Sequence, residues 1–180
     1  MDQIGFEAVV ITLIEKMRER GSWCSGTHLQ KAMFFLQEMM HVPTGLKFVL
    51  YKHGPYSFDL QPAINSMLAD QILSLQINDP GYGPSLVKGS NVEVVTKRSE
   101  EIIKEYLPKI EFIAEKFASK NVAELEREGT AFLVYSRENL GDDEEAIAFR
   151  ISKLKPHVSV DNAKAAFQEI KKIKDQAASL

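Results

Sequence analysis

The pattern of apolar and polar residues in the first half of the chain predicts helices that alternate with short strands. Apolar residues recur at intervals of three and four along three segments, and this spacing places them on one face of a helix. The helices expected from it span Ile4–Glu19, Thr27–Met40 and Leu60–Asp70. Short strands are expected at 48–51 and 72–77, with a return strand or strands over 86–87 and 92–95. The segment 78–84 is rich in turn-forming residues, and we expect it to form the tip of the hairpin.

The second half of the chain has a helical pattern throughout. Apolar residues keep the helical period after Arg98, and Ser99 and Asp161 stand where two of the helices should begin. In the first half, the order of helix, helix, strand, helix and hairpin is that of a winged helix. We therefore predict an α+β, mostly helical fold. Residues 1–96 form a winged-helix-like core with a small β-hairpin, and residues 97–180 form a C-terminal helical bundle packed on that core.

The charge balance limits what this fold can bind. The 180 residues carry 22 Lys and Arg against 25 Asp and Glu, a formal net charge of −3. A protein that holds nucleic acid through phosphate contacts normally has the opposite sign, so nucleic acid is a disfavoured partner. No apolar run approaches the length of a membrane span, and Cys24 is the single cysteine. These features predict a cytoplasmic protein with no membrane partner and no disulfide.

One block of seven residues, YKHGPYS from Tyr51 to Ser57, concentrates side chains that suit a site. We expect a turn at Gly54-Pro55 between the strand and the next helix, with Ser57 as the N-cap of that helix. Loops on a rigid scaffold often carry binding groups, and tyrosine is enriched at binding hot spots. The side chains predicted to contact a partner are Tyr51, Lys52, His53 and Tyr56, together with Lys31. A structural corner explains the tyrosines equally well, and a solvated ammonium is the simpler interpretation of Lys31.

Catalysis and metal binding have little support in the sequence. His53 has no second histidine or carboxylate at ligand spacing, since the other histidines are scattered along the chain. Acid–base chemistry needs a partner group within hydrogen-bond reach. Cys24 has no adjacent base that would activate its thiol. We therefore predict no catalytic residue, no metal and no cofactor, and an enzyme is the third of three candidate functions.

Two motifs resemble those of a known family. Residues 29–36 read LQKAMFFL and resemble the "LQKLLYFL" helix of the Panacea and SocA-like antitoxin superfamily and of its uncharacterised YwgA-type relatives. Residues 48–57 read FVLYKHGPYS and, with Leu60, resemble the "F..Y.yGPyS..L" signature of that family. The similarity covers about residues 4–95, and the family usually has Tyr or Phe where this chain has His53. The residues that carry the structural motif are Leu29, Gln30, Gly54, Pro55 and Ser57.

The resemblance implies a winged-helix-like core and a role in protein binding. The better-understood branches of the family are antitoxins that neutralise toxins by direct contact, and one branch acts as an adaptor that delivers its toxin to a protease. We therefore predict a non-catalytic protein-binding module, antitoxin-like or proteolytic-adaptor-like, whose partner is a protein such as a toxin encoded nearby. The alternative is a winged-helix DNA-binding transcriptional regulator. The acidic balance and the single lysine of the second helix oppose it, because a recognition helix presents several groups to bases and phosphates.

Overall fold

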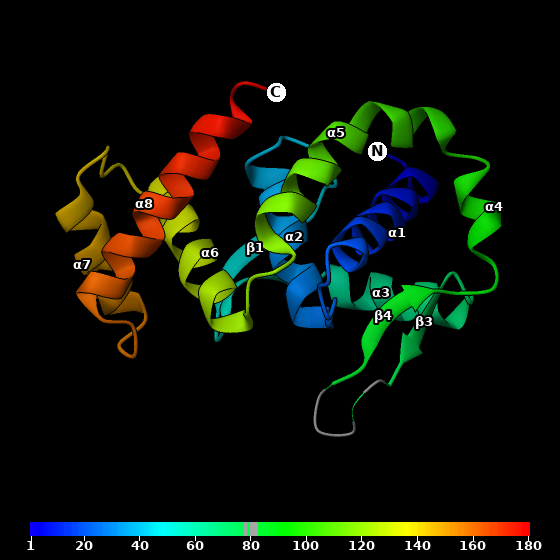
Figure 1. The fold of residues 1–180 in the computed structure, drawn as a ribbon, viewed down its shortest axis with the longest axis horizontal. Coiled ribbons are helices and arrows are strands. Elements are labelled where there is room, and N and C mark those ends of the chain that lie inside the picture. The colour runs from blue at the N-terminus through cyan, green and yellow to red at the C-terminus, as the bar shows by residue number, and fades with distance from the viewer. Residues whose placement is uncertain (78, 80–82) are drawn as a thin grey trace.

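The computed structural model describes residues 1–77, 79 and 83–180, and over these residues the chain forms eight helices and four short strands (Figure 1). The helices are α1 (Gln3–Glu19), α2 (Gly26–Glu38), α3 (Leu60–Ala69), α4 (Val92–Thr96), α5 (Glu100–Phe117), α6 (Val122–Arg137), α7 (Glu144–Leu154) and α8 (Val160–Ala177). The strands are β1 (Phe48–Tyr51), β2 (Gly54–Ser57), β3 (Leu73–Gln76) and β4 (Ser85–Lys88). The predicted α+β, mostly helical fold is confirmed.

Polar side chains fix where most of the helices begin. A side-chain oxygen accepts a hydrogen bond from the backbone N–H three residues further on at each of five helix starts, which satisfies one of the donors that a helix leaves free. These capping residues are Asp2, Ser25, Asn121, Asp143 and Ser159. Ser99 precedes α5 as expected but makes no such bond. The last helix begins at Val160, one residue before the expected Asp161, because Ser159 caps it.

The strands form two separate antiparallel hairpins, where we expected one. In the first, Phe48 pairs with Ser57 and Tyr51 with Gly54, so the turn lies at Lys52-His53. The turn predicted at Gly54-Pro55 and the N-cap predicted at Ser57 are therefore wrong, because these residues belong to β2. Gly54 has a φ of +86°, a conformation that glycine adopts at low cost. The chain consequently reverses just before Gly54, and residues 54–57 return along β1.

The return strand predicted over 92–95 is also wrong, because these residues form α4. Gly89 approaches the end of α3 so closely that a Cβ atom there would lie 2.0 Å from the backbone oxygen of Gln71. The backbone N–H groups of Gly89 and Asn91 donate to Ile72 and Gln71. These contacts turn the chain away from β4, and the β-branched residues that follow enter a helix despite their preference for strands. Of the expected hairpin tip, residues 78 and 80–82 lie outside the described residues.

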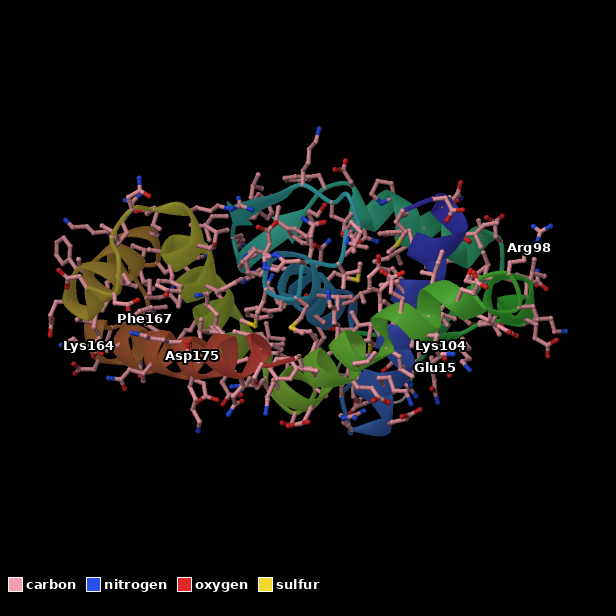
Figure 2. All side chains as sticks on the ribbon, turned by 90° about the horizontal axis from the view of Figure 1, so that it is seen from above. Glu15, Arg98, Lys104, Lys164, Phe167 and Asp175 are labelled. Atoms are coloured by element: carbon pink, nitrogen blue, oxygen red, sulfur yellow. The ribbon has the colours of Figure 1, made fainter. Side chains whose placement is uncertain are left out.

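The described residues form two hydrophobic cores. Figure 1 shows α6, α7 and α8 gathered toward one end of the molecule and α1, α3 and α4 toward the other. The larger one is built on α1, α2, α3 and α5. The smaller one gathers α6, α7 and α8 and includes Phe167, which Figure 2 labels on α8 at the end of the molecule opposite Arg98. Helix α5 lies against α1, and its Ile110, Ile113 and Phe117 belong to the larger core. The boundary that we expected between residues 96 and 97 stays a prediction. Helices α6 and α8 each contribute side chains to both cores.

Helix α6 lies close to the first hairpin at two glycines. A Cβ atom on Gly129 would lie 2.9 Å from Pro55 Cδ, and one on Gly54 would lie 3.2 Å from the backbone oxygen of Glu126. The proline ring is rigid and its strand is held by further contacts, so neither neighbour can move cheaply. These glycines allow the backbones of α6 and β2 to approach.

We expect Gly129→Ala to destabilise the fold by about 1 to 3 kcal/mol, the usual cost of overpacking, even though alanine is the better helix former. Gly26→Ala is the matched control, because Gly26 is also helical and a Cβ there meets no atom within 4 Å. The free energy of unfolding from denaturant titration decides the prediction. Equal stability of the two variants would mean that α6 does not press on the hairpin.

Candidate functional site

The outer edge of β2 is closed by two side chains of α2. Pro55 and Ser57 are two residues apart in an antiparallel pair, so both turn their backbone oxygens away from β1. Gln30 Nε2 donates to Ser57 O at 3.0 Å, and the Ser57 N–H donates to Gln30 Oε1 at 2.9 Å. Lys31 Nζ donates to Pro55 O at 2.8 Å. Pro55 has no N–H group that would need a partner on this edge. Gln30 and Lys31 thus replace a neighbouring strand.

Cations from the C-terminal helices hold the other side of the hairpin. Arg137 of α6 donates to Phe48 O at 2.8 Å. Lys155, which follows α7, donates to Tyr51 O at 2.8 Å and to Lys52 O at 2.6 Å. The hairpin turn is therefore fixed by a residue about a hundred positions away in the chain, and the C-terminal helices help to set its conformation.

A buried carboxylate, Glu126 of α6, sits under the hairpin turn. Its Oε1 lies 3.0 Å from Lys155 Nζ and 3.3 Å from His157 Nε2, and its Oε2 lies 3.7 Å from His53 Nδ1. Neither the 3.0 Å nor the 3.3 Å contact has hydrogen-bond geometry, and Oε1 has no hydrogen-bond partner among the described residues. Both histidines are largely exposed. Two lysines lie near this single carboxylate, Lys155 in direct contact and Lys31 close enough to interact through space.

Lys31 is buried, so the expectation of a solvated ammonium is wrong. Its exposed fraction is 2%, and burial lowers its pKa from 10.5 to about 8. The Glu126 carboxylate raises the pKa and the Lys155 ammonium lowers it, but both effects are smaller than that of burial. The helical pattern placed Lys31 beside an apolar face. This pattern could not show that the ammonium group would donate to Pro55 O and become buried.

Three aromatic rings stand together on the hairpin and just after it. The centroids of Tyr51 and Tyr56 are 5.5 Å apart, and Phe58 lies 5.3 Å from Tyr51 and 5.0 Å from Tyr56. Tyr51 is 53% exposed and Phe58 is 58% exposed. We call Tyr51, Tyr56 and Phe58 the aromatic patch. An exposed cluster of large apolar side chains is typical of a contact surface.

A cavity of about 460 Å³ opens beside the aromatic patch. It lies between the start of α2, the first hairpin, α3 and the second hairpin. Its lining is mostly apolar, and the charged and ionisable groups nearest to its hairpin side are Lys31, His53, Tyr51 and Tyr56. Four of the five side chains predicted to contact a partner therefore line one cavity. The fifth, Lys52, is exposed in the turn.

Other parts of the site were not foreseen. Phe58 follows the seven-residue block directly, and its aromatic character was a signal that sequence reasoning could have used. Glu126 and Lys155 carried no signal, because a charged residue in an amphipathic helix or just after one is normally solvated. Cys24 is buried, and burial raises the pKa of its thiol to about 12, so it is a poor nucleophile. In the described part of the chain, no group of three or more His, Cys, Asp or Glu is placed to hold a metal ion.

No protein-family model matches the chain, and no curated protein matches it. The resemblance to the Panacea superfamily therefore stays a hypothesis that rests on the two motifs. The contacts described above give these motifs a physical meaning in this chain. Gln30 and Lys31 of the first motif bond the backbone of Pro55 and Ser57 of the second. Leu29 is fully buried in the larger core.

Replacing Lys31 with methionine should remove a pH dependence of stability. The folded pKa of Lys31 is about 8, whereas unfolded lysine titrates at about 10.4, so the unfolded chain binds more protons between these values. The free energy of unfolding of the unmodified chain should therefore rise with pH through this window, by up to about 3 kcal/mol from this residue.

Denaturant titrations at pH 7 and pH 10 test this sign. The stability of the unmodified chain relative to Lys31→Met should increase between the two pH values. Lys52→Met is the control, because Lys52 is an exposed lysine of the same hairpin, and it should leave the pH dependence unchanged. If the difference in free energy of unfolding between the unmodified chain and Lys31→Met does not vary with pH, the pKa of Lys31 is not lowered in the folded protein.

Ser57→Ala should leave the free energy of unfolding unchanged or raise it, because a buried hydroxyl without a hydrogen-bond partner is costly and alanine removes it. The Ser57 hydroxyl is buried and has no hydrogen-bond partner among the described residues. Loss of a true N-cap would cost about 1 kcal/mol, so a thermal or chemical melt separates the two roles. A loss of that size would return Ser57 to the capping role that its sequence position suggested.

Proposed function

We propose that the chain is a non-catalytic protein-binding module that docks a partner protein on the aromatic patch and the adjoining cavity. The observation that carries the proposal is the exposure of Tyr51 and Phe58 on a hairpin whose backbone is held from both sides. Aromatic side chains on a rigid support lose little conformational freedom on binding, which is why such residues dominate interface energies. The partner is a protein with apolar groups that cover these rings.

An antitoxin-like role, or a proteolytic-adaptor-like one, fits this proposal best. Both require only a surface that recognises another protein, and the two motifs resemble a family with these functions. The partner would be a toxin encoded near this gene, and the module would act in the cytoplasm. No helix in the described part of the chain is both long and apolar enough to cross a membrane.

The arrangement of the site gives less support to the two alternatives. Helix α2, the second helix that we considered for DNA recognition, is buried from His28 to Leu36, so most of its side chains cannot reach a groove. For an enzyme, the candidate groups are engaged in structure. Lys31 bonds the backbone of Pro55, and Lys155 bonds the turn. Ser25 Oγ lies 2.9 Å from His28 Nδ1, but the same hydroxyl oxygen is the N-cap of α2 and accepts from the His28 N–H, so this pair is also engaged in structure.

Phe58→Ala should weaken partner binding by about thirtyfold, the effect of losing a hot-spot aromatic worth about 2 kcal/mol. The assay expresses the reading frames next to this gene one at a time, selects those that arrest growth, and asks which are neutralised by the chain. Binding of the selected product is then titrated with the unmodified chain and each variant.

Phe149→Ala is the matched control, because Phe149 is also 58% exposed but lies on α7, away from the hairpin. It should leave both growth rescue and affinity unchanged. The proposal fails if Phe58→Ala and Phe149→Ala behave alike, or if no neighbouring product binds the chain.

A further inference from the structure

One side of the cavity beside the aromatic patch carries hydrogen-bond donors and basic groups that would bind an anion, and the other side is apolar. The start of α2, Lys31 and His53 lie on the first side. The second side is formed by the aliphatic side chains of Ile64, Leu68, Leu75 and Leu86. No Asp or Glu lines the cavity among the described residues. A ligand that fits both sides carries a negative charge next to an apolar group.

Lys31 has hydrogen-bonding capacity left for such a ligand. An ammonium group has three donors, and Pro55 O is its one hydrogen-bond partner among the described residues. The Glu126 carboxylate influences Lys31 only through space, since no ion pair joins them. Buried donors without acceptors are costly, so an anion in the cavity would stabilise Lys31 in its charged form.

The first turn of α2 adds further donors on the same side. Ser25, Gly26 and Thr27 line the cavity. The backbone N–H groups of Gly26 and Thr27 lie in the first turn, where a helix has no internal acceptors for them. The positive end of the helix dipole also favours a negative charge there. Together with Lys31, these groups form a donor set that matches a carboxylate.

We propose that this cavity binds the C-terminal carboxylate of a partner chain whose last residue is apolar. A terminal residue carries its carboxylate and its side chain on one Cα atom, so both can enter a single cavity of about 460 Å³. In an extended segment, an acidic side chain and its apolar neighbour point to opposite faces, and only one of them could enter. This inference rests on the proposed function and names the part of the partner that the site recognises.

A matched pair of short peptides tests the inference without the natural partner. Acetyl-Ala-Ala-Ala-Phe with a free carboxylate is titrated into the full-length ¹⁵N-labelled protein, and so is the same peptide with a C-terminal amide. We expect the free acid to bind about tenfold more tightly, the ratio that one charge-assisted hydrogen bond supplies. The amide shifts should include Gly26, Thr27, Gly54 and Ile64. Lys31→Met should bring the two peptides to equal affinity, whereas Lys172→Met, at an exposed lysine of α8, should leave the preference unchanged.

A third peptide, acetyl-Ala-Ala-Glu-Phe-amide, separates a terminal carboxylate from an acidic side chain. The inference is overturned if this peptide binds as tightly as the free acid, if acid and amide bind equally to the unmodified chain, or if the shifts map outside the cavity. The acid–amide comparison needs no variant, so it stands even if Lys31→Met fails to fold. If none of the peptides binds while Phe58→Ala still weakens partner binding, the terminal-carboxylate subsite is rejected and the protein-binding function is kept.

Discussion

The free edge of β2 is the constraint on which the arrangement of this protein depends. A two-stranded hairpin pressed against helices leaves backbone groups buried on its outer edge, and each such group needs a partner. The Gln30 side chain accepts from the Ser57 N–H and donates to the Ser57 carbonyl, as a neighbouring strand would, and Lys31 donates to the carbonyl of Pro55. The edge thereby becomes part of the interior. Helix α2 can do this only at one position and one rotation relative to β2, so the bonds also fix how the two elements pack.

The same constraint explains why ionic groups collect under the hairpin. Lys31 is buried because its ammonium group donates to the carbonyl of Pro55. The Glu126 carboxylate lies near enough to oppose the effect of burial by raising the pKa of Lys31. Lys155 then links Glu126 to the turn through the carbonyls of Tyr51 and Lys52. Buried charges of this kind contribute little net stability. Their effect here is to hold the turn in one conformation. That conformation sets where Tyr51 lies relative to the other rings of the aromatic patch.

Apart from α4, the helices were predictable from the sequence because their apolar residues repeat at the helical period, and their ends agree with expectation to within a few residues. The strand character of residues 54–57 was not predictable. Gly-Pro is typical of a turn and serine of an N-cap, whereas here residues 54–57 pair with β1 and are bonded on their other edge by α2. Within the site, Tyr51, His53 and Tyr56 were identified by their types and their proximity in sequence. Glu126 and Lys155 were missed because they contact the hairpin turn across about 70 to 100 positions of chain, which no local pattern records.

Hydrogen exchange of the Ser57 backbone amide tests the central claim most directly. This N–H points away from β1 and has Gln30 Oε1 as its acceptor, so its protection reports on the side-chain bond alone. The account predicts that in the native protein it exchanges as slowly as the amides of α2, and that Gln30→Leu accelerates it by about tenfold or more while the amides of α8 are unaffected. An amide of Ser57 that exchanges as fast as those of exposed turns in the unmodified protein would contradict the account, because the edge of β2 would then be open to water.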